Sequence, residues 1–317
     1  MSRNILIIIL ALLSLGLNQR GNNKLTSVHR FSSAKRITIV NFPTDGGRWT
    51  DLMIAKFEQQ LSATQMPFEF TTLSWTFATK IESFVNRAKA ANPEFIFLPD
   101  DMMYRHLAKP LQEATGAFIL FVAMYQKKDS LNEVTNQAGV FCDGPIDNLL
   151  KQARKFMPAK SVGIVGGPLA QNMSDRIVEK IEAIATTEVF LTKSWNSYRK
   201  KILEYSQKYD VIWPLAPFGV TTTNGKPVSD EQINALMNEV NKPALGYGRI
   251  SLIQRTMDMN IDPLDIGRNA AHIAFKYFQG ENLGVQEFTS YALRINNQHV
   301  NRLGLQVPKE LHGFVSF

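Results

Sequence analysis

The sequence predicts an α/β protein made of two tandem units, each a parallel sheet with crossover helices. Strand-like and helix-like segments alternate along most of the 317 residues, which is the pattern of β-α-β units. The polar run at 126–137 interrupts this alternation once, and the alternation then restarts. The chain is also longer than one hydrophobic core usually allows, so two domains of ordinary size are expected.

The first unit begins after a polar lead-in at 18–35. Its apolar, β-branched runs predict strands at 36–41, 68–73, 94–98 and 117–123. Helical spacing predicts helices at 47–61 and 78–91 and a short one ending near 115. The first of these helices places Trp49, Met53 and Phe57 on one face.

The second unit repeats the plan. Strands are predicted at 138–142, 161–165, 188–191, 210–215 and 243–246. A helix opens at Pro145, and two more are predicted at 170–185 and 197–207. Ser229 and Gln232 have the spacing of a capping box and predict the start of a fourth helix.

The stretch 261–311 follows both units. Asp262 is placed as an N-cap and Pro263 at the first helical position, with apolar residues at helical spacing up to Gly280. A short strand and a short helix follow within 292–311. A helix and a strand added after complete α/β units must pack on something built earlier. We therefore expect them to close a two-lobed protein whose functional site is the cleft between the lobes.

The N-terminus is typical of an exported protein. Arg3 precedes an apolar run from Ile5 to Leu17, which is too short to span about 30 Å of hydrocarbon but suits a secretory signal peptide at 1–20. An uncleaved membrane anchor is the alternative. Cys142 is the only cysteine, so the chain forms no internal disulfide and has no lipid-attachment cysteine after the leader. We expect a periplasmic protein.

Charge and motifs argue against two other classes of protein. The net charge is +7, but lysines and arginines are scattered, so no nucleic-acid partner is expected. The five histidines are not spaced as metal pairs, and no nucleophile elbow, H-E-x-x-H motif or phosphate loop occurs. Cys142 lies within a predicted strand and suits a small buried side chain. We expect neither an enzyme nor a cofactor.

The order of several stretches resembles a known family. They are QAGVFCDGPIDNLLKQARKFMP, SVGIVGG, YDVIWPLAP, KPALGYG, DIGRNAAHIAFKYFQGEN and RINNQHVNRLGLQVPKEL. Together they resemble the periplasmic substrate-binding proteins of ABC transporters, in the family that includes tryptophan- and tyrosine-binding members. The resemblance covers 138–311 by sequence and 36–126 by element order alone. The family-like ending is carried by Asn296, Val300, Leu303, Gly304, Leu305, Pro308, Glu310 and Leu311.

The resemblance implies a type I periplasmic-binding-protein fold, with two doubly wound, Rossmann-like lobes joined by a hinge of about three crossing segments. Residues 36–126 plus 258–284 would form lobe 1, and 127–257 plus 285–317 would form lobe 2. A monomer of this kind captures a small organic ligand, for which an amino acid is one candidate, and delivers it to an ABC permease. The alternative is a sensor that reports to a membrane kinase or cyclase. A repressor of this fold would need a helix-turn-helix where the leader stands.

Ligand contacts are expected beyond the carboxyl ends of the strands. In the first lobe these ends offer Thr44, Asp45, Trp49, Asp100 and Tyr125. Asp45 suits a ligand amine, and Trp49 and Tyr125 suit a ring. Trp49 could instead pack in the core, Asp100 could cap a helix, and Tyr125 could lie in the crossover.

In the second lobe the candidates are Gly167, Phe218, Thr221, Arg249 and Asp258. Gly167 would let backbone N–H groups approach an anion, or would simply form a tight turn. Arg249 and Asp258 could pair with ligand charges or with each other. Related proteins often carry an aspartate just after the strand at 210–215, where this chain has Pro217 and Phe218. That departure leaves the recognition of a ligand amine open.

Overall fold

The computed structural model describes residues 33–42, 48–76, 78–123, 134–142, 144–249 and 255–316. The predicted signal peptide at 1–20 lies outside these ranges. Within them, none of the helices combines the length and the apolar character that crossing a membrane requires.

The first lobe is built on a six-stranded sheet in the order β11-β5-β4-β3-β1-β2, with parallel pairing throughout. Its strands are β1 (Lys35–Asn41), β2 (Phe68–Ser74), β3 (Phe95–Leu98), β4 (Phe118–Ala123), β5 (Gln137–Phe141) and β11 (Val285–Glu287). The central strand β3 is buried at every position. Helices on both faces of a parallel sheet produce such continuous apolar runs, because neither face of the strand meets water.

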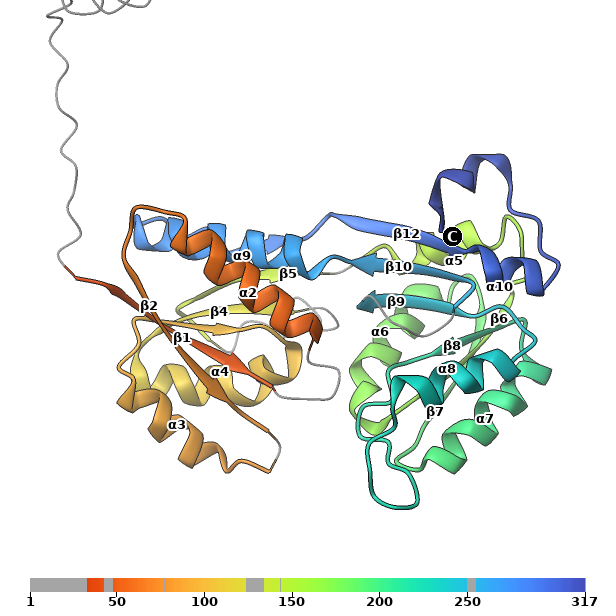
Figure 1. Cartoon of the computed structure of the whole chain (residues 1–317), viewed down its shortest axis with the longest axis horizontal. Helices are drawn as coiled ribbons and strands as arrows, with labels where there is room; N and C mark the ends of the chain where they lie inside the picture. The colour runs from red at the N-terminus through yellow and green to blue at the C-terminus, as the bar shows by residue number, and fades with distance from the viewer. Residues whose placement is uncertain are drawn as a thin grey trace, which may run out of the picture. The chain divides into compact units, whose positions relative to one another are not determined.

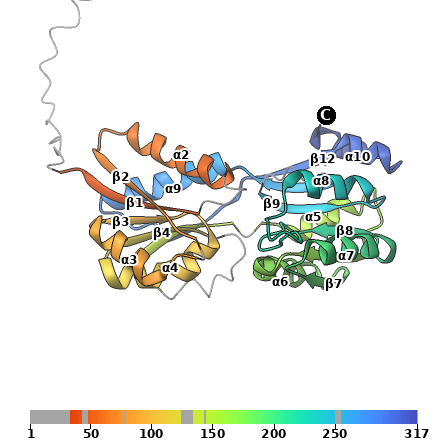
Figure 2. The same cartoon turned by 60° about the horizontal axis from the view of Figure 1, so that its bottom comes forward.

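Two pairs of helices cover this sheet. In Figures 1 and 2, α2 (Arg48–Ser62) and α9 (Pro263–Phe278) lie side by side on one face, and α3 (Ile81–Ala90) and α4 (Asp101–Thr115) cover the other. The α2–α9 contact is close, because a Cβ added at Gly267 would lie 2.4 Å from the carbonyl oxygen of Met53. The helix predicted at 261–280 therefore returns to the first lobe, and Asp262 caps it by accepting from the N–H of Leu264.

The second lobe contains a parallel sheet in the order β7-β6-β8 and a four-stranded sheet in the order β13-β12-β10-β9. The parallel strands are β6 (Ser161–Gly166), β7 (Thr186–Leu191) and β8 (Val211–Pro214). The second sheet comprises β9 (Leu245–Arg249), β10 (Met257–Ile261), β12 (Tyr291–Asn296) and β13 (Val315–Ser316). A single parallel bridge between Ile212 and Ala244 joins the two sheets.

Helices again divide between two cores. The α5 (Ile146–Ala153) and α6 (Gln171–Ile181) side chains belong to one apolar cluster, and those of α7 (Trp195–Lys208) and α8 (Asp230–Glu239) to another. The predicted capping box starts α8, with both hydrogen bonds formed between Ser229 and Gln232. Short helices η2 (Pro168–Ala170), α10 (Asn297–Arg302) and η3 (Lys309–Phe314) complete the lobe.

Three segments of chain pass between the lobes. They connect β5 to α5, β10 to α9, and β11 to β12. Tyr247 of β9 ties the first segment down, since its hydroxyl accepts from the Gly144 N–H at 2.7 Å and donates to the Cys142 carbonyl at 3.1 Å. The third is held where the N–H of Phe288 donates to the Phe141 carbonyl at 2.8 Å. The predicted hinge of about three crossings is confirmed.

Some elements differ from those predicted. Strands β10 and β11 were not expected, and the helix predicted at 170–185 divides into η2 and a shorter α6 that ends at Ile181. The α4 helix, expected to be short, spans Asp101–Thr115. Strands β5 and β11 pair in the first sheet, although the predicted division assigns 127–257 and 285–317 to lobe 2. The first crossing therefore follows β5 rather than the polar run at 126–137.

Candidate functional site

The carboxyl ends of the six parallel strands lie along one edge of the first sheet, where ligands of such sheets bind. An aromatic cluster stands there. The Phe42 and Trp75 ring centroids are 5.6 Å apart, and those of Trp75 and His106 are 5.7 Å apart. The backbone N–H of Trp75 donates to the Asn41 carbonyl at 2.9 Å, which fixes this cluster to the end of β1. Sequence reasoning missed Trp75, although it lies two residues after the predicted strand at 68–73.

Two predicted first-lobe residues have structural roles here. Trp49 is 6% exposed within the core, and its indole N–H donates to the Ile261 carbonyl at 3.5 Å. Asp100 caps α4, because its Oδ1 accepts from the N–H of Met102 at 2.9 Å. Both match the structural alternatives weighed from the sequence. Thr44, Asp45 and Tyr125 lie outside the described residues, so their contribution stays a prediction.

In the second lobe the ends of β6 and β8 meet, because these strands are neighbours. Gly167 and Phe218 come together there. A Cβ at Gly167 would lie 2.1 Å from the Phe218 carbonyl oxygen, so only glycine lets the loop after β8 pack so closely. Thr221 lies apart from this contact and is exposed, with its N–H bonded to the Lys193 carbonyl at 2.8 Å.

A polar surface crosses β9, β10 and β12, and we call it the hinge face. Asp258 is in register with Gly246 of β9 and Arg294 of β12, and Asn260 is two residues further along β10. Alternation along β10 sends Met257, Met259 and Ile261 into the apolar core, which leaves Asp258 and Asn260 on the opposite face. The hinge face comprises Gly246, Gly248, Arg255, Asp258, Asn260, Ala292 and Arg294.

The charged groups of the hinge face are held in place. Arg255 is 6% exposed and runs closely over Gly246, where an added Cβ would lie 2.2 Å from its Cδ. Its Nη2 donates to the Pro214 carbonyl at 3.2 Å, so the guanidinium also reaches the end of β8. Burial raises the pKa of Asp258, although Arg255 and Arg294 act in the opposite direction.

Asp258 is the predicted residue that belongs to this hinge face, whereas Arg255 and Asn260 were missed. The alternation of Met257, Asp258, Met259, Asn260 and Ile261 is the signal that could have found them. Arg249 ends β9, but its side chain lies outside the described part of the chain.

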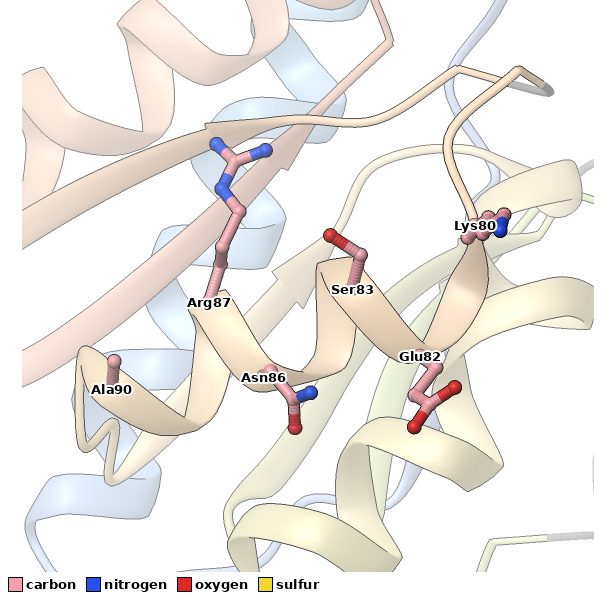
Figure 3. Close-up of a pocket in the computed structure, with 6 residues that line it drawn as sticks. All are labelled: Lys80, Glu82, Ser83, Asn86, Arg87 and Ala90. Atoms are coloured by element: carbon pink, nitrogen blue, oxygen red, sulfur yellow. The ribbon is translucent and has the colours of Figure 1, made fainter.

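Two surface hollows occur elsewhere. The first, of about 490 Å³, borders α3 and its N-cap residue Lys80, and its six lining residues are drawn in Figure 3. The second, of about 500 Å³, lies among α5, β10, β12 and η3. Neither is lined by a residue predicted from the sequence to touch ligand. These hollows therefore do not coincide with the strand ends.

The expected chemistry of Cys142 is consistent with the structure. The residue is fully buried, and burial raises the pKa of its thiol, with the nearby Asp101 carboxylate adding to the effect. A thiol with a raised pKa is a poor nucleophile at neutral pH. Among the described residues, no three His, Cys, Asp or Glu side chains are placed to hold a metal ion.

Comparison with known proteins gives a likeness of fold. No family model and no curated sequence matches the chain. An ABC domain from Streptococcus pneumoniae in complex with L-Trp has a TM-score of 0.69 and 16% identity, over 90% of this chain and 100% of that one. A conserved domain protein from Vibrio cholerae has a TM-score of 0.66 and 16% identity, over 90% of this chain and 99% of that one.

Other similar structures widen the range of functions. A ligand-free, open substrate-binding protein with adhesive properties from Clostridium difficile has a TM-score of 0.64 and 16% identity, over 89% of this chain and 98% of that one. Sugar-binding proteins and LacI-family transcriptional regulators share the fold at lower TM-scores. At this identity the likeness concerns the fold alone. The chain therefore has the type I fold of the ABC transporter substrate-binding proteins, with two doubly wound lobes joined by three crossing segments.

Proposed function

We propose that the protein is an exported solute-binding protein, a relative of the ABC transporter substrate-binding proteins, that captures a small organic solute between its lobes. The observation that carries this proposal is the match in fold to the complete chain of the protein that holds L-Trp. The fold alone also suits a LacI-type regulator. The signal peptide predicted at 1–20 favours export to the periplasm over binding to DNA.

Capture follows from the way the crossings join the lobes. One buried cluster is confined to the first lobe and another to the second, a third includes residues of both, and three segments connect the lobes. A solute that touches the strand ends of both lobes stabilises the closed state over the open one, because it binds the closed state more tightly. The contacts we propose include the predicted residues Asp45, Gly167, Phe218 and Asp258.

An amino acid is the ligand class we favour. The hinge face carries both signs of charge, on Asp258 and Arg294. At the edge of the first sheet the partly exposed Phe42 ring offers an apolar surface, with the buried Trp75 ring 5.6 Å from it. A zwitterion with an apolar side chain matches both features, and a micromolar dissociation constant corresponds to about −8 kcal/mol, which a few polar anchors in a cleft can supply.

A thermal-shift screen of amino acids, small carboxylates and sugars tests the proposal. At a hundredfold excess over its dissociation constant, the true solute adds about 2.7 kcal/mol to the free energy of unfolding. For a chain of this size that corresponds to a rise in Tm of several degrees. A folded monomer whose Tm none of these solutes raises would contradict capture of a small solute.

The partner needs a separate measurement. A permease with its ATPase, reconstituted in vesicles, should hydrolyse ATP faster when the solute-loaded protein is added. Stimulation of a membrane kinase or cyclase by the loaded protein, with no effect on the permease, would instead support the sensing role.

A further inference from the structure

Asp258 is a half-buried carboxylate that makes no close ion pair within the described part of the chain, although Arg255 and Arg294 lower its pKa from a greater distance. In the described part of the chain its one hydrogen bond comes from Asn260, and no lysine, arginine or histidine nitrogen lies within 4.0 Å of it. Partly removing an ionised carboxylate from water is unfavourable, and a carboxylate without a close ion pair can accept a hydrogen bond from a charged group of a ligand. The described residues contain no companion carboxylates, histidines or cysteines placed to build a metal site around it.

Asn260 holds this carboxylate in one orientation. Its Nδ2 donates to Asp258 Oδ1 at 2.6 Å, and the reverse amide orientation would place two oxygens at that distance. The second carboxylate oxygen, Oδ2, is left to accept from another donor. Asn260 is 3% exposed and its own Oδ1 has no hydrogen-bond partner among the described residues, so the pair offers acceptor oxygens together with the second N–H of the amide.

The neighbouring strands place small residues beside this pair on the hinge face. Asn260 is in register with Gly248 on β9 and Ala292 on β12. Neither neighbour has a long side chain that could cover Asp258 or bond to it. Asp258 is more exposed than Asn260, so the carboxylate is the more accessible member of the pair.

Positive charge lies beside this acceptor pair. Arg294 is exposed and lies directly opposite Asp258 on β12. Arg255 directly precedes Thr256, and its side chain lies against Gly246 on the same face. The face therefore combines a carboxylate with flanking guanidinium groups. A zwitterionic amino acid complements that arrangement, with its ammonium group on Asp258 and its carboxylate on the cationic side. A hexose supplies neither charge.

We propose that Asp258 binds the ammonium group of a captured amino acid and that Asn260 is the positioning residue for that carboxylate. This inference rests on the proposed function and names the chemical class of its ligand.

Calorimetry on the full-length protein tests the assignment. The probes are the twenty L-amino acids, their N-acetyl derivatives, their deamino carboxylic acids and a set of hexoses. A free amino acid should bind, and removing its charged amine should weaken binding about 10- to 100-fold, the effect of a hydrogen bond to a charged group. Asp258→Asn should weaken binding of the free amino acid by a similar factor and leave binding of the deamino analogue within about threefold.

Two further variants distinguish the positioning of Asp258 by Asn260 from a general effect on folding. Asn260→Ala should weaken amino-acid binding by about 3- to 10-fold, since Asp258 keeps its charge but loses its orientation. The matched control is Asp147→Asn, an exposed carboxylate of α5 that is paired with Lys151 at 2.8 Å, and it should leave affinity unchanged. Without ligand, Asp258→Asn should be at least as resistant to heat as the parent protein, because folding then buries no unpaired charge.

The outcomes are distinguishable. Binding of a hexose, or amino-acid binding that Asp258→Asn leaves intact, would overturn the role of Asp258 while solute capture stands. Equal losses of affinity for the free and deamino solutes would show that Asp258 acts only on the structure. No binding by any probe would overturn the proposed function itself.

Discussion

Single buried side chains decide where this protein is sensitive to its conditions, and His299 is one of them. It is 2% exposed, and its Nδ1 lies 3.2 Å from Thr256 Oγ1, which in turn accepts from the N–H of Ala244 at 2.9 Å. This chain of contacts links α10 to the starts of β10 and β9. Burial lowers the pKa of His299 to about 4, and the nearby Arg302 adds to that effect.

We therefore predict that acid destabilises the protein through His299. Its pKa is about 6.5 when unfolded and about 4 when folded, so stability falls as pH drops through that range, by up to about 3 kcal/mol. His299→Asn keeps a group that can bond Thr256 but does not titrate, and it should flatten this part of the profile. Urea unfolding between pH 7 and pH 4 measures the effect.

A surface histidine gives the control for that prediction. His312 is exposed, and His312→Asn should leave the pH profile of unfolding unchanged. If the profile of His299→Asn were as steep as that of the parent protein, burial of this imidazole would not be the cause of the acid sensitivity.

At the scale of elements, the α2–α9 pair shows how closely distant segments approach. The two helices are separated by 200 residues of sequence and meet where Gly267 faces the backbone of Met53. A backbone carbonyl cannot move aside as a flexible side chain can. The pair therefore depends on the absence of a single methyl group.

We predict that Gly267→Ala destabilises the first lobe by about 1 to 3 kcal/mol, through overpacking against Met53 that outweighs the better helix propensity of alanine. Gly313→Ala is the control, since nothing lies within 4 Å of its added Cβ. It should change the free energy of unfolding by less than about 0.5 kcal/mol. Urea denaturation compares the two, and equal stabilities would contradict the close approach.

Elements with strong local signals were predictable from the sequence. The α8 and α9 helices begin where Ser229 and Asp262 predicted, because caps act within one turn of helix. Strand β10 was missed because its apolar residues are two methionines and one isoleucine, a weak signal without the pairing strands beside it. The hinge face was missed with it, since register with β9 and β12 joins residues that are far apart in the chain.

At the scale of the whole molecule, function depends on how the crossings are held. Tyr247 belongs to β9, yet its hydroxyl bonds the backbone on both sides of the first crossing, at Cys142 and Gly144. Its ring also lies 6.4 Å from that of Tyr291, which starts β12 after the third crossing. One side chain therefore contacts the first connection between the lobes and the start of the strand that follows the third.

We predict that Tyr247→Phe lowers the free energy of unfolding by about 1 to 3 kcal/mol, because the Gly144 N–H loses its acceptor. It should also change the dissociation constant of the solute, because we expect the two lobes to close by bending at this first crossing. Tyr198→Phe is the matched control, because it removes a buried hydroxyl bonded to the Leu215 carbonyl at 3.0 Å within one lobe. If calorimetry found the same solute affinity for both variants, a role of Tyr247 in the closure of the lobes would be contradicted.

Local patterns in the sequence predict the α/β class and the two tandem units, because hydrophobic period, capping residues and element order are local properties of the chain. The returning helix and the number of crossings were implied by the resemblance to a known family. Tertiary structure alone decided which strand ends meet: Gly167 with Phe218, Trp75 with Phe42, and Asp258 between Gly246 and Arg294. Strand register and close backbone approach set these neighbours, and both depend on segments that are distant in sequence.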